Sequence, residues 1–295
     1  MTSTLTTVDS TYPLSTGHRI PIIGFGTAGE TAAHFKVPRT LLIPAISHAL
    51  EVGYRHIDSA VGYDSERPSS IAIRASNIPR EDIFFTTKCM PRGYEAARKH
   101  VEESLRATGF SYIDLYLVHC PYGGREMRLR TWDALVEAQR RSQVRSLGVS
   151  NYGVGHLEEL WEYIVSREKR EGKGAAGGIS VAQYELHPWL ARPDIVGWCR
   201  EHGVAVEAYS PLIKGKRMDE PILQALARKY GKSTAQILLR WSLQMRFVPL
   251  PKSSTPRRIE ENVDVFDFEL DGEDMKVLDT GKYEPCTWDP TVSKD

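Results

Sequence analysis

The sequence predicts an α/β fold in which eight parallel strands alternate with helices and close into a barrel. Short β-branched runs recur along the chain and are nearly all apolar, as expected for strands that are buried on both faces. Amphipathic segments between these runs indicate helices, so the pattern is that of repeated strand–helix units. Eight units in 295 residues favour a closed barrel over an open doubly wound sheet. GFGTAGE, after the first run, also lacks the GxGxxG spacing of the dinucleotide loop expected in such a sheet.

A β-hairpin comes first in the predicted order of elements, because TYPLSTGHRIP (11–21) alternates around a Ser-Thr-Gly turn. The eight barrel strands are expected at 20–27, 55–60, 83–88, 114–121, 144–151, 181–187, 205–212 and 247–254. Helices are expected within 37–53, 94–109, 129–141, 156–170 and 233–245, and an extra loop helix within 218–231. We expect the Gly- and Lys-rich segment 169–180 to be an exposed insertion, and Pro285 and Pro290 to exclude a helix from the tail.

The composition narrows the classes of partner. Lys plus Arg and Asp plus Glu both total 38, so the zero net charge gives no reason to expect nucleic acid or an anionic membrane. The four cysteines form neither a CxxC pair nor a zinc-ligand spacing, which predicts reduced thiols and no metal site. The N-terminus lacks a signal-peptide pattern, and no apolar run approaches the ~20 residues that span a bilayer. We expect one cytoplasmic domain over residues 1–295, a monomer or weak dimer that binds a small molecule.

Four side chains suited to proton transfer fall at or just past the C-terminal ends of apolar runs. They are Asp58, Tyr63, Lys88 and His119. In an alternating barrel such positions converge on one mouth. Taken singly, each residue has an ordinary structural explanation. An Asp after a strand can cap a helix, a Tyr in a loop can pack against the core, a Lys at a strand end can be solvated, and a His can be hydrogen-bonded without any catalytic role. Together, a carboxylate, a phenol, an ammonium and an imidazole form an acid–base site.

Three long motifs, in matching order and spacing, resemble the signatures of the aldo-keto reductase family. The first is GYRHIDSA (53–60) followed by Tyr63 and Glu66, the second is RSLGVSNY (145–152) and the third is LPKSSTPRRIEEN (250–262). The resemblance covers nearly the whole chain. It implies a TIM barrel that binds NADP(H) across its mouth and reduces aldehydes or ketones to alcohols, or catalyses the reverse reaction.

The resemblance implies that Asp58, Tyr63, Lys88 and His119 are the catalytic tetrad. Reduction of a carbonyl needs a hydride, which the nicotinamide supplies, and a proton, for which Tyr63 is the expected donor. We expect protonated Lys88 to lower the pKa of the Tyr63 phenol by roughly two units from its free value near 10. Asp58 is expected to keep Lys88 charged, and His119 to hydrogen-bond the substrate oxygen.

A phosphate site is expected where the helix after the last strand begins. Thr255 can cap that helix and Pro256 suits its first position. Lys252, Ser253 and Arg258 would grip a 2′-phosphate, which predicts NADP(H) rather than NAD(H). The resemblance implies the other cofactor contacts: Ser150, Asn151 and Gln183 with the carboxamide, Tyr209 with the nicotinamide ring, Glu261 and Asn262 with adenine, and Thr27, Asp58, Ser210 and Leu212 along the cofactor.

Two positions beside the expected substrate pocket depart from the family pattern. Ala28 and Cys120 stand where many relatives carry Trp. Two missing indoles should widen the mouth, because an aromatic side chain buries about 150–250 Å². We therefore expect a bulky carbonyl substrate. Tyr122, Trp189 and Trp288 are further candidates to line the pocket.

The sequence leaves two alternative functions possible, and it does not decide the role of one loop. The basic loop KGKR (214–217) either closes over the cofactor pyrophosphate or is a solvated turn. The protein could be a non-catalytic NADP(H) sensor of the same fold, against which the complete tetrad argues. It could also be a barrel isomerase or aldolase that uses Lys88 as a Schiff-base nucleophile, against which Asp58 beside a charged Lys88 argues.

Overall fold

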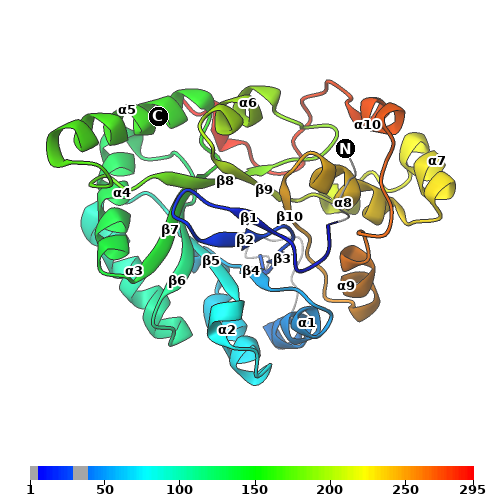
Figure 1. The fold of residues 1–295 in the computed structure, drawn as a ribbon, viewed down its shortest axis with the longest axis horizontal. Helices are drawn as coiled ribbons and strands as arrows, with labels where there is room; N and C mark the ends of the chain where they lie inside the picture. The colour runs from blue at the N-terminus through cyan, green and yellow to red at the C-terminus, as the bar shows by residue number, and fades with distance from the viewer. Residues whose placement is uncertain (1–5, 29–38) are drawn as a thin grey trace.

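The computed structural model describes residues 6–28 and 39–295 and confirms the predicted barrel (Figure 1). Each strand pairs in parallel with its neighbours in chain order. The barrel strands are β3 (Phe25–Gly26), β4 (His56–Asp58), β5 (Phe84–Cys89), β6 (Ile113–Val118), β7 (Val144–Ser150), β8 (Ile179–Glu185), β9 (Ala205–Tyr209) and β10 (Val248–Leu250). The amides of Gly24 and Gly26 donate to the carbonyls of Pro249 and Pro251, each at 3.0 Å, and these bonds join the first strand to the last. That residues 1–295 form one domain stays a prediction.

Helices surround these strands (Figure 1). They are α1 (Arg39–Glu51), α2 (Glu66–Ala75), α3 (Tyr94–Thr108), α4 (Gly124–Arg140), α5 (Val154–Glu171), α6 (Pro193–Glu201), α7 (Pro221–Tyr230), α8 (Thr234–Gln244), α9 (Pro256–Val263) and α10 (Gly272–Leu278). Short 3-10 turns are η1 (Val61–Tyr63), η2 (Arg80–Asp82), η3 (Ile213–Gly215) and η4 (Pro290–Val292). The extra helix predicted within 218–231 is α7. The first two residues of the helix expected at 37–53, and residues 1–5 of the leader, lie outside the described residues.

The predicted hairpin is confirmed, since β1 (Thr11–Pro13) pairs antiparallel with β2 (Arg19–Pro21). The strand expected at 20–27 is therefore wrong as one element, because its start belongs to the hairpin and only β3 belongs to the barrel. Between them the backbone passes close to its neighbours: a Cβ at Gly24 would lie 2.6 Å from both His56 and Leu250 side-chain atoms. Glycine is needed there, and the strand direction changes at this point.

The segment 169–180 is not simply an exposed insertion. Its first residues, Lys169–Glu171, extend α5, and its end begins β8 at Ile179. Ala176 is buried, and its carbonyl accepts a 2.9 Å hydrogen bond from the indole of Trp132 in α4. The tail prediction also needs correction, because Pro290 begins the turn η4. Proline fits the first position of a helical turn, where no amide donor is required.

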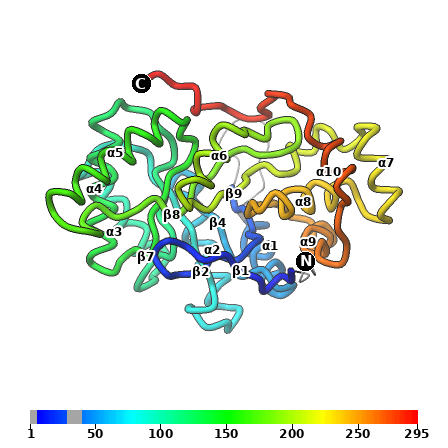
Figure 2. The backbone as a smooth tube through the Cα atoms, turned by 45° about the horizontal axis from the view of Figure 1, so that its top comes forward, coloured from blue at the N-terminus to red at the C-terminus, as the bar shows by residue number. Residues whose placement is uncertain are grey.

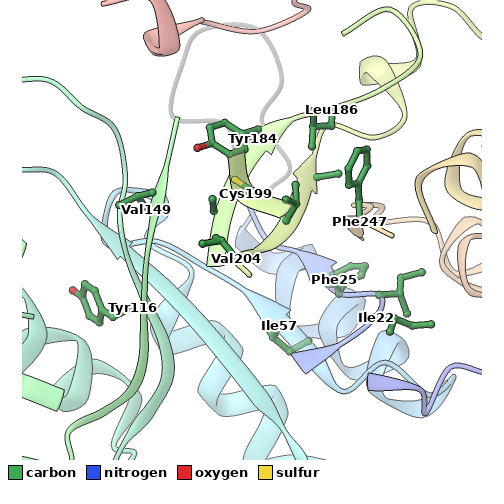
Figure 3. Packing of buried hydrophobic residues seen from close by; sticks show 14 of the residues in the cluster. Ile22, Phe25, Ile57, Tyr116, Val149, Tyr184, Leu186, Cys199, Val204 and Phe247 are labelled. Atoms are coloured by element: carbon green, nitrogen blue, oxygen red, sulfur yellow. The ribbon is translucent and has the colours of Figure 1, made fainter. Parts of the chain in front are cut away.

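Two apolar layers build the core. Tyr116 and Val118 of β6 belong to the large cluster between strands and helices, part of which Figure 3 shows. The alternate residues Leu115 and Leu117 belong to a smaller cluster inside the barrel, which the hairpin residue Ile20 joins. This alternation is the two-residue period of a strand buried on both faces.

The hairpin and the C-terminal tail lie at opposite ends of the barrel (Figure 2). Ser15 and Thr16 of the hairpin loop bond Ser180 and Ser146, near the starts of β8 and β7. The tail instead bonds Glu185, the last residue of β8. The C-terminal strand ends, where sites form in such barrels, therefore face the tail. Among the described residues no helix has the length and apolarity to cross a membrane.

Candidate active site

Three successive strands bring the four predicted catalytic side chains to one mouth. Asp58 ends β4, Lys88 lies near the end of β5, and His119 directly follows β6. Tyr63 ends η1, the short turn after β4. Neighbouring parallel strands place their C-terminal ends side by side, which confirms the predicted convergence of these residues.

Lys88 and Asp58 form a buried ion pair. Lys88 Nζ donates to both carboxylate oxygens of Asp58, at 2.7 and 2.8 Å, and to the carbonyl of Ser59 at 2.8 Å. Burial opposes the charge of Lys88, but the charge and hydrogen bonds of Asp58, together with Tyr63 and Glu207, more than offset it and raise the pKa of the amine. Lys88 is therefore a fixed ammonium group, as predicted from the sequence.

Tyr63 is only partly exposed, and its hydroxyl lies 3.3 Å from His119 Nε2. Lys88 Nζ is 5.1 Å from the centroid of the phenol ring. The prediction that Lys88 lowers the pKa of this phenol is wrong for the net shift. Burial raises the pKa of Tyr63 by more than the positive charge of Lys88 lowers it, and the negative charge of Asp58 adds to the rise. Tyr63 is consequently a protonated phenol at neutral pH.

His119 is a neutral imidazole. Burial, assisted by the positive charge of Lys88, lowers its pKa to about 3. Its backbone carbonyl accepts a 3.0 Å hydrogen bond from the side-chain amide of Asn151. The ring is thus held beside Tyr63 without adding a second positive charge to the mouth.

A cleft of about 870 Å³ runs from these groups toward the end of β10 and the start of α9. Its volume lies within the range of about 300–1,000 Å³ found for small-molecule sites. The predicted site residues on its wall are Ala28, Asp58, Tyr63, His119, Ser150, Asn151, Gln183, Tyr209, Ser210, Leu212, Lys252, Ser253, Arg258, Glu261, Asn262 and Trp288. Residues from most of the barrel strand ends therefore meet in one cleft.

A hydrogen-bonded group of side chains forms the inner wall of the cleft. Asn151 donates to Ser150 Oγ at 3.0 Å, and its carbonyl accepts a 2.8 Å bond from the Tyr209 hydroxyl. Gln183 Nε2 donates to Asp58 Oδ1 at 2.9 Å and to Glu207 Oε2 at 2.7 Å. Because both acceptors are carboxyl oxygens, the NH₂ end of the Gln183 side chain is the end that faces Asp58 and Glu207.

The outer end of the cleft carries the predicted cations. Lys252 and Ser253 follow β10, and Arg258 lies exposed in the first turns of α9. Pro256 is the first residue of α9, as predicted. Thr255 occupies the cap position, but its side chain does not cap. Instead the Ser253 hydroxyl accepts a 3.1 Å bond from the Thr255 amide, which shapes the turn before the helix.

Several predicted residues are not among the described residues on the cleft wall. Thr27 is buried, and its hydroxyl donates to the Asp58 carbonyl at 2.8 Å. Cys120 is buried with its sulfur 3.8 Å from that of Met90, so the structure gives it no place on the wall. Trp189 is also buried, and its ring lies below the guanidinium of Arg217 at 5.0 Å. Substrate roles for Cys120 and Trp189 therefore have no geometric support.

Tyr122 is half-buried and reaches the site through Trp288. The centroids of these two rings are 5.7 Å apart, in an edge-on arrangement. Trp288 itself lies on the cleft wall, 6.2 Å from the ring of His119. Its placement agrees with the expected substrate side of the mouth.

Sequence reasoning missed parts of the wall. Ser233, Thr234 and Ala235 line the outer cleft at the start of α8, where Ser233 and Gln236 form a capping box. Lys214 of the KGKR loop also lines the cleft. The buried acid Glu207 was missed too, although an acidic residue inside the apolar run AVEAY is a visible signal.

The fold also assembles a group that the chain spacing did not predict. Glu185, His187 and Cys286 place one potential metal-ligand atom each within 4.8 Å of one another. Hydrogen bonds already engage both oxygens of Glu185, from His187 Nε2 at 2.9 Å and from tail amides. These bonds explain why the three side chains lie together: they form a structural contact between the end of β8 and the tail.

Comparisons with known proteins agree with this geometry. The aldo/keto reductase family model matches residues 22–281. A glyoxal reductase of Bacillus subtilis is 37% identical, over 93% of this chain and 93% of its own. A 9,11-endoperoxide prostaglandin H2 reductase of Trypanosoma cruzi is 38% identical, over 80% of each chain. The crystal structure of an aldo/keto reductase from Brucella melitensis superimposes with a TM-score of 0.81 at 37% identity, covering 92% of this chain and 98% of that chain.

Proposed function

Because the chain belongs to the aldo/keto reductase family and is an oxidoreductase, we propose that it reduces an aldehyde or ketone with NADPH, and that Tyr63 delivers the proton. The observation that carries the proposal is the constellation at the mouth. A neutral phenol lies 3.3 Å from a neutral imidazole, above a buried Lys88–Asp58 ion pair. Asp58, Tyr63 and His119 border the cleft of about 870 Å³, a volume typical of small-molecule sites.

The donor set of the cleft fits a nicotinamide cofactor. Ser150, Asn151 and Gln183 would hold the carboxamide at the inner end, beside the ring of Tyr209. Lys252 and Arg258 supply positive charge at the outer end, which supports a 2′-phosphate and hence NADP(H) over NAD(H). When bound, the reduced nicotinamide supplies the hydride.

Proton delivery follows from the charge states of the side chains. The raised pKa keeps the Tyr63 phenol protonated through the neutral range, so it can donate its proton to the substrate oxygen. His119 is placed to hydrogen-bond the same oxygen and to orient it. The ammonium of Lys88 then stabilises the tyrosinate that is left behind.

The wide mouth supports a bulky substrate. Ala28 is exposed on the cleft wall, where a larger side chain would narrow the opening. The names of the relatives include both a small dialdehyde and a lipid endoperoxide as substrates, so they do not decide the size. Measured turnover that favours small aldehydes and excludes multi-ring ketones would contradict this part of the proposal.

The proposal is tested by Tyr63→Phe. We expect NADPH binding, followed by fluorescence titration, to stay within about twofold of wild type. Oxidation of NADPH at 340 nm with a panel of carbonyl compounds should fall by about 10²–10⁴-fold, the range for loss of a general acid. Tyr112→Phe is the matched control, because the Tyr112 hydroxyl is buried without a partner just before β6, away from the mouth.

Retained turnover in Tyr63→Phe would remove Tyr63 from the role of proton donor. Tight NADPH binding by wild type without turnover of any carbonyl would instead favour a sensor. Borohydride trapping of a substrate on Lys88 would favour Schiff-base chemistry. A fully buried ammonium bonded to both oxygens of Asp58 is a poor nucleophile, so we expect no trapped adduct.

The four cysteines are free thiols, which supports the proposal of a reducing, cytoplasmic location. The expected monomer or weak dimer stays a prediction.

A further inference from the structure

The carboxylate of Glu185 holds one short part of the C-terminal tail. Its Oε1 accepts a 2.5 Å bond from the amide of Cys286, and its Oε2 accepts a 3.0 Å bond from the amide of Thr287. The hydroxyl of Thr287 donates to the same Oε2. Glu185 is buried at the end of β8, so these bonds tie residues 286–287 to the rigid barrel.

The next residue along the tail is Trp288. Its ring lies on the cleft wall, edge-on to both His119 and Tyr122. Two adjacent amides are held by one carboxylate directly before it, so the direction in which Trp288 leaves the backbone is set by Glu185. Trp288 is 43% exposed, so its ring contacts with His119 and Tyr122 cover only part of it.

The tail on either side has separate anchors. The amide of Glu284 donates to the carbonyl of Trp189 at 2.9 Å. Beyond Trp288, the hydroxyl of Thr291 accepts a 2.6 Å bond from Arg192. Asp289 also pairs with Arg192, at 3.8 Å, and the carbonyl of Cys286 accepts a 3.4 Å bond from Lys216. Loss of the Glu185 contact should therefore free the amides of Cys286 and Thr287 and loosen Trp288, and leave the rest of the tail in place.

We propose that Glu185 is a positioning residue for substrate selection, which holds Trp288 as the wall against which an aromatic or other bulky apolar carbonyl compound packs. The inference rests on the proposed carbonyl reduction. Glu185 does not touch the reacting atoms and acts through the tail. His187 Nε2, which donates to Oε1 at 2.9 Å, orients the carboxylate from below.

The carboxylate is ionised at every working pH. Burial opposes its charge, but the hydrogen bonds from His187, Cys286 and Thr287 lower the pKa of Glu185 to about 2. The titratable groups that face it are His187 just past the β8 end, Tyr209 of the neighbouring strand β9 and the thiol of Cys286, with Lys214 and Lys216 beyond that thiol. The contact should accordingly not depend on pH above about 4.

The test compares kcat/KM for a naphthyl ketone with kcat/KM for propanal, which has no aromatic surface to pack against Trp288. In Glu185→Gln one acceptor oxygen becomes an NH₂ group that faces tail donors, so the tail should be released. We expect the ketone-to-propanal ratio to fall about tenfold, the low end for a specificity contact in an apolar pocket. Thr287→Val, which removes one donor from the tail side, should lower the ratio in the same direction by less.

The double variant Glu185→Gln/Trp288→Ala shows whether the effect passes through Trp288. We expect Trp288→Ala to lower the ratio, and the added Glu185→Gln change to lower it no further. Glu284→Gln is the matched control, since it removes a tail carboxylate that pairs with Lys282 and Arg217 rather than with residues 286–287. The ketone-to-propanal ratio of Glu284→Gln should equal that of wild type, because the contact between Glu185 and residues 286–287 stays intact. Any effect of the variant on cofactor binding would act on both substrates alike and leave the ratio unchanged.

Amide hydrogen exchange gives a readout that does not need activity. In Glu185→Gln, the amides of Cys286 and Thr287, which Glu185 accepts from, should exchange at least tenfold faster, with the amide of Glu284 unchanged. An unchanged ratio in Glu185→Gln, additive effects in the double variant, or unchanged exchange of the Cys286 and Thr287 amides would each overturn the inference. If wild type reduced neither substrate, the proposed function would fail instead, and the exchange experiment would still decide whether Glu185 holds the tail.

Discussion

The two ends of the cleft are built differently. At the inner end, Asp58 and Lys88 are buried on strands, His119 directly follows β6, and Tyr63 ends the short turn η1 after β4. Lys88 alone makes three hydrogen bonds of 2.8 Å or less. At the outer end, Arg258 is exposed on a short helix, and Ser253 is held by local turn bonds.

The difference reflects what each end has to do. Proton transfer demands heavy-atom distances of about 2.6–3.2 Å, so its groups are carried by the stiffest part of the fold. Attraction of a phosphate falls off gently with distance, so long cationic side chains on a surface helix suffice. Changes at the inner end should therefore affect both catalysis and folding, and changes at the outer end only the affinity for the cofactor.

Lys88→Met tests the inner end and has the largest expected effect. It leaves Asp58 buried without a countercharge, which should cost about 3–5 kcal/mol in the free energy of unfolding measured with urea. Turnover should fall at least about 10³-fold, because the tyrosinate loses its stabilising charge. Asp58→Asn/Lys88→Met should recover much of the stability without the activity. Wild-type stability in the single variant would show that this end is not built around the ion pair.

Arg258→Ala tests the outer end and should have an intermediate effect. The dissociation constant for NADPH should rise about tenfold, with that for NADH nearly unchanged, because one charge-assisted contact to the 2′-phosphate is lost. Stability against urea should stay the same, since the side chain is exposed. Arg257→Ala is the control: Arg257 pairs with Glu261 at 2.8 Å and is not among the cleft residues. Equal losses in both variants would mean that general charge, rather than a specific contact, attracts the cofactor.

Glu207→Gln tests the buried acid that bonds Gln183 beneath the inner end of the cleft. It should have the smallest effect on turnover, within a few-fold. Burial, with the nearby negative charge of Asp58, raises the pKa of Glu207 to about 8. Between about pH 5 and 8 the folded acid keeps a proton that the unfolded chain has lost, so the free energy of unfolding should fall as pH rises. The slope is at most about 1.4 kcal/mol per pH unit.

Urea unfolding of wild type and Glu207→Gln at pH 5 and pH 8 measures that slope. The variant carries no titrating group at this position and should lack the contribution, while its amide oxygen can still accept from Gln183. Parallel pH dependence in the two proteins would show that Glu207 is ionised throughout.

Patterns local in the chain were enough to predict the barrel and the meeting of the four catalytic candidates. A strand end is visible in sequence, and parallel strands bring their ends together, so Asp58, Lys88 and His119 had to share a mouth. The side chain of Cys120 was not predictable in this way. The residue follows His119 beyond the end of β6, and its sulfur lies against Met90 rather than on the cleft wall, so a neighbour of a cleft residue need not face the cleft.

The sequence by itself determined the order of strands and helices, and which side chains stand at the barrel mouth, because these depend on spacing along the chain. Only the tertiary structure decided the charge state of Tyr63, where burial prevailed over Lys88. It also decided that Glu185 meets Cys286, 101 residues away. Desolvation and long-range contact depend on distances through space, which the order of residues does not specify.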